Sequence, residues 1–481
     1  MISQDLMAPI MFGGLIVFLL IGYPAAFSLG AVGLFFSFIG IEMGMFQPTF
    51  LQALPDRVFG ILSNDLLLSI PFFTFMGAIL EKCGLAEDML EGLGQLFGPV
   101  RGGLAYAVII VGAILGAITG TVAASVIAMG LISLPIMLRY GYNPRVATGV
   151  IAASGTITQL IPPSLVLIVL ADQLGKSVGD MYAGAIGPSI IQVALFCLFI
   201  FFLSIFRPQD VPALPPEARP KIDWKLFKKI LWGIVPSIAL IFLVLGTILM
   251  GLATPTEGGA MGSVGALVLA AMNKRLQKTL VWDAMTSTMR INAMVIFILI
   301  GSTVFGLAFR GVDGDLWIEH LLSGLPGGQV GFLIVVNLFV FFLAFFLDYF
   351  EIAFIIIPLL APVAQKLGID LIWFGVLLGA NMQTSFMHPP FGFALFYLRG
   401  VAPKSVKSSD IYYGALPWVG LQLILVAIII FIPETVTYFI DKPAIAVDAN
   451  AISVDPLAGV EQNEITVDSS SEIERQLREN K

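Results

Sequence analysis

Two sets of oxygen-bearing side chains stand out in this chain, and each set lies just before a pair of prolines. The first set is Ser154, Thr156 and Thr158, followed by Pro162 and Pro163, and the second is Asn381, Gln383 and Ser385, followed by Pro389 and Pro390. Residues at i and i+2 do not share a helix face, and proline removes a backbone donor, so each set predicts a locally unwound segment inside a helix. Such a segment offers backbone carbonyls beside hydroxyls and amides, which suits a cation such as Na⁺.

The two sets belong to a longer repeat. The stretch from Thr119 to Pro163 matches the stretch from Phe346 to Pro390 at a constant offset of 227, which also aligns Pro135 with Pro362 and Gly141 with Gly368. A similar phrase follows each copy, DMYAGA from Asp180 and DIYYGA from Asp410. Broken helices in corresponding positions of two halves are typical of secondary transporters.

The repeat predicts two related cation sites. The residues proposed for the first are Thr119, Gly120, Thr121, Ser154, Thr156 and Thr158, and those for the second are Asp348, Asn381, Gln383 and Ser385. Against this, hydroxyls in membrane helices often bond only to their own preceding turn. The paired pattern favours the sites.

Asp348 is the most informative single residue, because a carboxylate at the centre of a membrane helix costs ~2.5 to 3.5 kcal/mol on insertion scales. It lies in an otherwise apolar run. The sequence leaves three roles open: binding Na⁺, taking up a proton, or capping the tip of a hairpin. Glu351, three residues later, could share its cluster or cap a half-helix.

Composition sets the class of protein. Of 481 residues, 58% are hydrophobic and only 12% are charged, whereas soluble domains carry roughly 25% charged residues. Apolar runs near the ~20 residues that cross a bilayer recur along the chain, which predicts an all-α polytopic membrane protein. Two cysteines and two histidines offer no spacing for a disulfide, a metal cluster or a catalytic set. We therefore expect neither an enzyme nor a cofactor, and no nucleic-acid partner.

The element order predicts two halves. We expect a first half over 1–206, a linker over 207–229, a second half over 230–435, and an acidic, disordered tail over 436–481. Within the halves we predict hairpins over 102–138 and 327–365 and broken helices over 146–170 and 371–398. Two spans hinged at Gly22 and Pro24 open the chain, and the more polar stretch from Gln47 to Asn64 suits an interfacial loop.

Charge predicts the topology. If both hairpins re-enter the membrane, each half crosses five times, so the halves are inverted. Placing the linker in the cytoplasm then puts 17 of the 25 Lys and Arg residues inside, in line with the positive-inside rule. This agreement favours re-entrant hairpins over full spans.

Four motifs carry a resemblance to a known family. The phrases GAITGTVAAS, SGTITQLIPPS, ATPTEGGAMG and MHPPFGFALFYLRGVAP resemble the DctM-like large membrane subunit of tripartite ATP-independent periplasmic (TRAP) transporters, over nearly the whole chain to about residue 435. The last motif is similar to the branch labelled mannitol/chloroaromatic.

The resemblance implies a scaffold with a mobile elevator domain, as in the ion transporter superfamily, in a bacterial inner membrane. It implies Na⁺-driven uptake of an organic anion, mostly a small carboxylate. It also implies two partners besides membrane lipid: a DctQ-like small membrane subunit and a DctP-like periplasmic binding protein. We expect the small subunit to be a separate chain, because no helical domain precedes Ala8. The alternatives are an ion-coupled transporter that needs no binding protein, a channel and, least favoured, a membrane enzyme.

Overall fold

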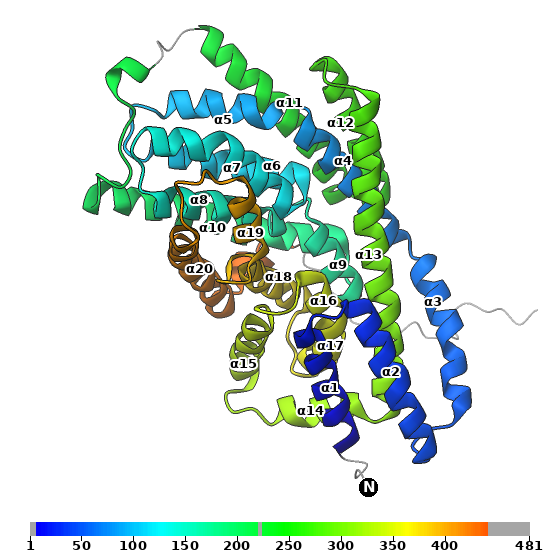
Figure 1. Ribbon diagram of the computed structural model, residues 1–481. Helices are drawn as coiled ribbons and strands as arrows, with labels where there is room; N and C mark the ends of the chain where they lie inside the picture. The colour runs from blue at the N-terminus through cyan, green and yellow to red at the C-terminus, as the bar shows by residue number, and fades with distance from the viewer. Residues whose placement is uncertain (1–5, 220–223, 441–481) are drawn as a thin grey trace, which may run out of the picture. The chain divides into compact units, whose positions relative to one another are not determined.

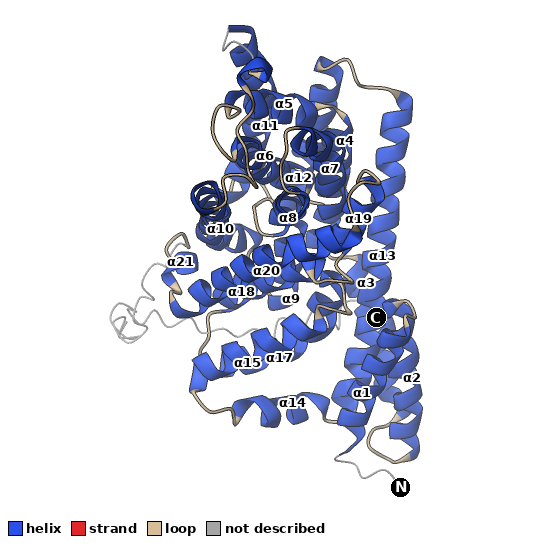
Figure 2. Ribbon diagram, turned by 60° about the vertical axis from the view of Figure 1, so that its left-hand side comes forward, coloured by secondary structure: helices blue, strands red, loops and turns tan. Residues whose placement is uncertain are grey.

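The computed structural model describes residues 6–219 and 224–440, and every regular element in these ranges is a helix (Figures 1 and 2). Among them, seven helices are long and apolar enough to cross a membrane, or up to nine if each of two bent pairs counts as one span. The predicted all-α polytopic class is confirmed.

A frame of long helices packs together from both halves of the chain. Gly22, at φ 91°, separates the first two of these helices at the predicted hinge. Contacts join α4 to α12, α2 to α13 and α11 to α12. The frame helices are α1 (Met7–Ile21), α2 (Ala25–Glu42), α4 (Asp65–Lys82), α11 (Trp224–Leu249), α12 (Pro255–Met272) and α13 (Lys278–Gly311).

The stretch from Gln47 to Asn64 is helical, so its prediction as a loop is wrong. It forms η2 (Pro48–Ala53) and α3 (Leu54–Leu62). Pro48 and Pro55 stand in the first turn of these helices, where proline is tolerated because the first N–H groups have no helical acceptor.

The remaining helices follow the same order in each half. A short helix leads into two helices joined by a turn, the segment predicted as a hairpin. A helix broken before two prolines comes next, and one long helix ends the half. The first series is α5 (Leu85–Leu96), α6 (Gly103–Thr119), α7 (Val122–Arg139), α8 (Pro144–Thr156), η3 (Ile157–Gln159), α9 (Leu165–Leu174) and α10 (Val178–Phe206). The second is α14 (Gly314–Ser323), α15 (Gly328–Leu343), α16 (Tyr349–Glu351), the π-helical η5 (Ile352–Ile356), α17 (Ile357–Lys366), α18 (Leu371–Met382), η6 (Gln383–Met387), α19 (Phe393–Val401) and α20 (Ser408–Phe431).

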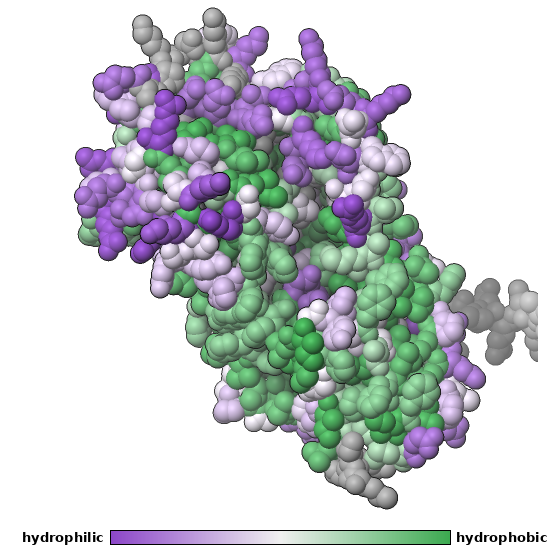
Figure 3. All heavy atoms as spheres, viewed as in Figure 1, coloured by the Kyte–Doolittle hydropathy of each residue, from purple (hydrophilic) through white to green (hydrophobic). Residues whose placement is uncertain are grey.

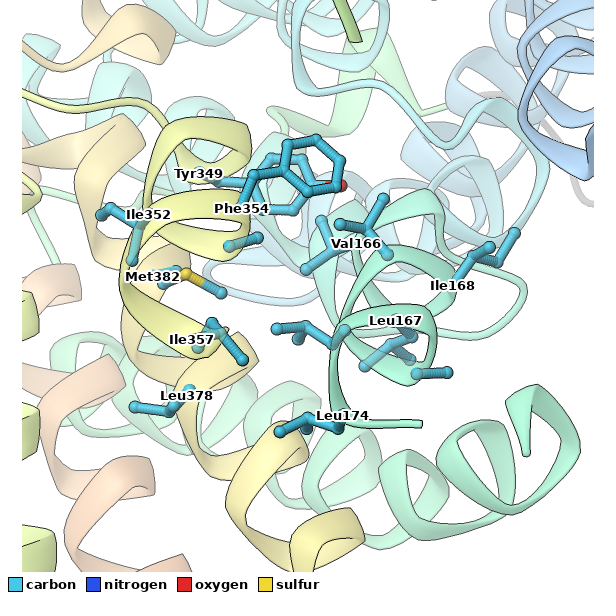
Figure 4. Packing of buried hydrophobic residues seen from close by; sticks show 14 of the residues in the cluster. Val166, Leu167, Ile168, Leu174, Tyr349, Ile352, Phe354, Ile357, Leu378 and Met382 are labelled. Carbon is cyan, nitrogen blue, oxygen red and sulfur yellow. The ribbon is translucent and has the colours of Figure 1, made fainter. Parts of the chain in front are cut away.

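The two halves exchange contacts. The returning arm of the second hairpin packs on α9 of the first half, where Phe354 and Ile357 lie against apolar side chains such as Leu167 (Figure 4). Conversely, α7 of the first hairpin packs on α19: a Cβ atom on Gly130 would lie 2.8 Å from Val401 and 3.0 Å from Leu398. Each hairpin is therefore supported by the broken helix of the other half.

Apolar side chains also cover much of the surface. Figure 3 shows them over α1, α2 and α15, whereas polar side chains gather at the opposite end of the view. Phe27, Phe38 and Phe342 are each more than 60% exposed. Large outward-facing apolar side chains on long helices are what a lipid environment selects.

The structure shortens two predicted segments, the linker and the C-terminal tail, because helices extend into both. Helix α11 begins at Trp224, inside the stretch 207–229 that we predicted as linker, and η4 (Pro216–Ala218) is a short turn within it. Of the predicted tail 436–481, the described residues include the end of α21 (Glu434–Thr437), where Val436 is buried. The tail from residue 441 onward lies outside the described residues.

Candidate functional site

The first broken helix frees carbonyl oxygens where the two prolines stand. In an α-helix the carbonyl of residue i accepts from the N–H of residue i+4, so Pro162 and Pro163 leave Thr158 and Gln159 without their helical donors. The hydroxyl of Ser164 donates to the carbonyl of Gln159 at 2.6 Å and caps the start of α9. The carbonyl of Thr158 therefore lacks the N–H donor that a continuous helix would supply.

The second broken helix repeats this arrangement. Helix α18 ends at Met382, η6 continues as a tight turn, and α19 begins after the prolines. Both Pro-Pro bonds are cis. Because Pro389 and Pro390 have no backbone N–H, the carbonyls of Ser385 and Phe386 lack the donors that a continuous helix would supply. A Cβ atom on Gly392 would lie 2.5 Å from the Phe386 carbonyl oxygen, so only glycine allows this close approach.

The side chains of both polar sets are buried, but their hydrogen bonds differ. We call these sets the first triad (Ser154, Thr156 and Thr158) and the second triad (Asn381, Gln383 and Ser385). Thr156 and Thr158 donate to the carbonyls of Ala153 and Gly155 in their own turn, at 2.8 and 3.0 Å, which is the local bonding that competes with a site role. Within the two triads, three buried oxygens have no hydrogen-bond partner in the described part of the chain. They are Ser154 Oγ, Asn381 Oδ1 and Ser385 Oγ.

The tip of the first hairpin lies beside the first break. Gly120 ends α6 with φ 62°, and Thr121 precedes α7 without a side-chain cap. The side chain of Thr119 is not among the described ones. A Cβ atom on Gly112 would lie 2.7 Å from Ser154, and one on Gly116 would lie 3.0 Å from Thr158. Small residues thus bring α6 against the polar segment of the broken helix.

The tip of the second hairpin is held by a reciprocal cap. Asp348 Oδ1 accepts the N–H of Glu351 at 2.8 Å, and Glu351 Oε2 accepts the N–H of Asp348 at 2.9 Å. This capping box begins α16. Among the described residues, no hydrogen bond joins Asp348 to the second triad. The structure therefore gives Asp348 the capping role, and its second carboxylate oxygen has no part in the box.

Two glutamines that the sequence reasoning missed complete the site. Gln192 of α10 donates to Gln383 Oε1 at 2.6 Å, and Gln422 of α20 donates to Thr156 Oγ1 at 3.0 Å. Both glutamines are fully buried. A signal was present, because each follows the aspartate of the repeated DMYAGA or DIYYGA phrase by the same 12 residues.

A separate cavity of about 540 Å³, lined by both charged and apolar residues, opens between α13 of the frame and the helices of the second hairpin and first broken helix. Helices α3, α13 and α14 line one side, and α9, η5 and α17 line the other. Arg57 and Arg310 are exposed here, and within the described ranges neither guanidinium has a hydrogen bond or an ion pair.

The carboxylates of this cavity are mostly engaged. Asp172 accepts from the amides of Asn64 and Gln173 at 2.6 and 2.8 Å, and Glu319 is paired with Lys366. Among the described residues, Asp315 accepts a hydrogen bond only from the N–H of Leu316, in its own helical turn. Of the described charged groups that line the cavity, only the two arginine guanidinium groups have no hydrogen bond or ion pair.

Residues 12–435 match the model of the tripartite ATP-independent periplasmic transporter, DctM component. The chain belongs to the DctM family. It is therefore a large permease component of a TRAP transporter, a multi-pass protein of the inner membrane, and its family consists of transport permeases rather than enzymes. The narrower mannitol/chloroaromatic branch stays a prediction.

Several DctM relatives match along most of their length. The C4-dicarboxylate TRAP transporter large permease of Rhodobacter capsulatus is 29% identical, with 89% of this chain and 97% of the relative covered. The isethionate TRAP permease DctMQ of Oleidesulfovibrio alaskensis is 26% identical, with 90% of this chain and 66% of the relative covered. The sialic acid permease SiaT of Haemophilus influenzae is 25% identical, with 88% and 66% covered.

A solved structure supports the fold of this DctM chain. The YdaH transporter of Alcanivorax borkumensis, described as having an unusual topology, superimposes with a TM-score of 0.56 at 15% identity. The match covers 79% of this chain and 86% of YdaH. The two proteins thus share an architecture.

Proposed function

We propose that this DctM-family chain moves a small organic anion into the cell by coupling its uptake to Na⁺. The observation that carries the proposal is the pair of broken helices, whose prolines free backbone carbonyls next to buried oxygens without protein partners. Ser154 Oγ in the first half, and Asn381 Oδ1 and Ser385 Oγ in the second, are such oxygens within the described residues. Hydroxyl, amide and carbonyl oxygens together suit a desolvated Na⁺ ion.

Each half would hold one ion. The tip of the first hairpin, at Gly120 and Thr121, would close over the first site, because α6 already lies against the break. Asp348 would serve the second site with its second carboxylate oxygen, while Oδ1 caps α16 by accepting the N–H of Glu351.

The cavity between frame and broken elements supports an anionic substrate. Guanidinium groups present a fork of donors that matches carboxylates and sulfonates. Under the predicted topology only four described cations lie on the outer side: Arg57, Lys176, Arg310 and Lys366. Arg57 and Arg310 line the cavity, and Lys366 is bonded to its wall at Glu319. An anion arriving from outside would meet the guanidinium groups of Arg57 and Arg310 there.

Movement would follow the division between frame and broken elements. The exchanged contacts bind the hairpins and broken helices of both halves into one body. The described polar contacts between that body and the frame include the bond between Asn64, at the start of α4, and Asp172, near the end of α9. We propose that the body shifts along the frame as an elevator, so that this bond breaks in each cycle.

Two partners complete the proposed transporter. By family definition a TRAP large permease works with a small membrane subunit and a binding protein, and the relative named DctMQ carries both membrane components in its name. We propose that this chain needs both partners as well.

Reconstitution tests the proposal. Proteoliposomes would contain this chain and its small subunit, with the binding protein outside, and uptake of candidate organic acids would be measured with and without an inward Na⁺ gradient. Uptake that requires both the gradient and the binding protein is expected. Uptake by this chain without a binding protein would favour the independent ion-coupled transporter, and flux that does not saturate would favour a channel.

A further inference from the structure

The two broken helices touch each other directly at their breaks. Gln383, in the second break, donates its side-chain amide to the backbone carbonyl of Thr156, in the first break, at 2.6 Å. Both residues are buried, with 1% of Gln383 and none of Thr156 exposed. They are also equivalent positions of the repeat, 227 residues apart. One hydrogen bond therefore connects the centres of the two candidate cation sites.

The last helix of each half reaches the break of the other half. Gln192 lies on α10 of the first half and holds Gln383, with amide contacts of 2.6 and 3.4 Å in the two directions. Gln422 lies on α20 of the second half and holds the hydroxyl of Thr156. Figure 2 shows α18 and α20 running close together. The four side chains form a crossed arrangement that follows the symmetry of the repeat.

This arrangement fixes the orientation of the groups that would bind the ions. The amide of Gln383 can turn only if it gives up its bonds to Gln192 and to the Thr156 carbonyl. Inside a protein such bonds are strong, because an unpaired buried amide is costly. Thr156 is equally fixed, since its hydroxyl donates to Ala153 and accepts from Gln422.

We propose that Gln192 and Gln422 are positioning residues that couple the two cation sites, so that Na⁺ binds cooperatively. The inference rests on the proposed Na⁺-coupled function. An ion that binds at one break orders that segment, and the Gln383–Thr156 bond transmits the order to the other break. The second ion then binds a segment that is already ordered, so less of its binding free energy is lost to ordering that segment. Neither glutamine touches an ion in this scheme.

Methionine variants of the two glutamines test the coupling. Methionine keeps the length and volume of glutamine but donates no hydrogen bond. Na⁺ activation of uptake would be measured with the complete transporter in proteoliposomes for the wild type, Gln192→Met and Gln422→Met. We expect a Hill coefficient above 1 for the wild type that falls to about 1 in both variants, with half-saturating Na⁺ raised about fivefold or more.

Ser189→Ala is the matched control. Ser189 is a buried polar residue three positions before Gln192 on α10, and its hydroxyl bonds to Ala185 at 2.7 Å and Leu160 at 3.2 Å. It reaches only the first half, so its removal should leave the Hill coefficient unchanged. A second readout needs no substrate: the melting temperature of the purified complex would be titrated with Na⁺, and the same loss of cooperativity is expected.

The outcomes separate this inference from the proposed function. A wild-type protein indifferent to Na⁺ would overturn both. Na⁺-dependent uptake with a Hill coefficient of 1 in the wild type, or with an unchanged coefficient above 1 in both methionine variants, would overturn the coupling and leave the proposed function standing. Testing the glutamines one at a time, from two different helices, keeps the result readable if one variant fails to fold.

Discussion

The carboxylate of Asp348 can be tested for two roles with two substitutions. One of its oxygens caps α16 through the N–H of Glu351, and the other is proposed to bind Na⁺. The substitution Asp348→Asn keeps an acceptor for the cap and removes the charge, because asparagine is as good a helix cap as aspartate. Asp348→Ala removes both.

The magnitudes of the two effects differ. Loss of the cap in Asp348→Ala should lower the free energy of unfolding by about 1 kcal/mol, whereas Asp348→Asn should change it by less than about 0.5 kcal/mol. Loss of the charge should weaken Na⁺ binding about tenfold in both variants, which corresponds to about 1.4 kcal/mol.

Two assays on the same preparations separate these effects. Thermal unfolding of the purified complex reports the cap, and Na⁺ activation of uptake in proteoliposomes reports the charge. We expect Asp348→Asn to melt like the wild type and to need about tenfold more Na⁺. If Asp348→Asn shows normal Na⁺ activation, Asp348 acts only as a helix cap and the assignment to the second cation site is wrong.

Three further predictions concern packing, substrate and movement. A Cβ atom on Gly149 would lie 2.3 Å from the backbone carbonyl oxygen of Gly414 on α20. Gly149→Val should therefore lower the free energy of unfolding by about 1 to 3 kcal/mol, measured by thermal unfolding. Gly420→Ala should not lower it, because no described neighbouring atom lies within 4 Å of a Cβ atom there. Arg57→Gln should raise the KM for the organic anion about tenfold without altering Na⁺ activation, and Arg57→Lys should recover part of the loss; an unchanged KM for Arg57→Gln would remove the cavity from the substrate path. A thiol cross-link between Asn64→Cys and Asp172→Cys, with Cys83 and Cys197 replaced, should stop uptake until it is reduced, and full activity of the linked protein would refute the elevator.

The breaks could be predicted from the sequence because their cause is local. Two successive prolines remove helical donors wherever they stand, and the polar residues before them follow a spacing that no single helix face explains. The hinge at Gly22 was visible for a similar reason, since glycine accepts the positive φ that the turn needs.

Long-range partners could not be predicted in the same way. The repeat places Gln192 and Gln422 at matching positions, but their hydrogen bonds are made to helices that lie far away in the sequence. The roles of Asp348 stayed open because a carboxylate at a helix start can cap, bind or titrate. His388 is buried against the rings of Phe341 and Phe345.

In this protein each hairpin packs on the broken helix of the other half, and this affects how the protein is synthesised. When the ribosome has released the first half, α7 and α9 have entered the membrane, but the faces that will bind α19 and the second hairpin are still exposed to lipid. These faces can be covered only after residues near 400 have been synthesised. The first half should therefore depend on the membrane insertion machinery or on chaperones during that interval. Two fragments separated at the linker should fold only when they are expressed together.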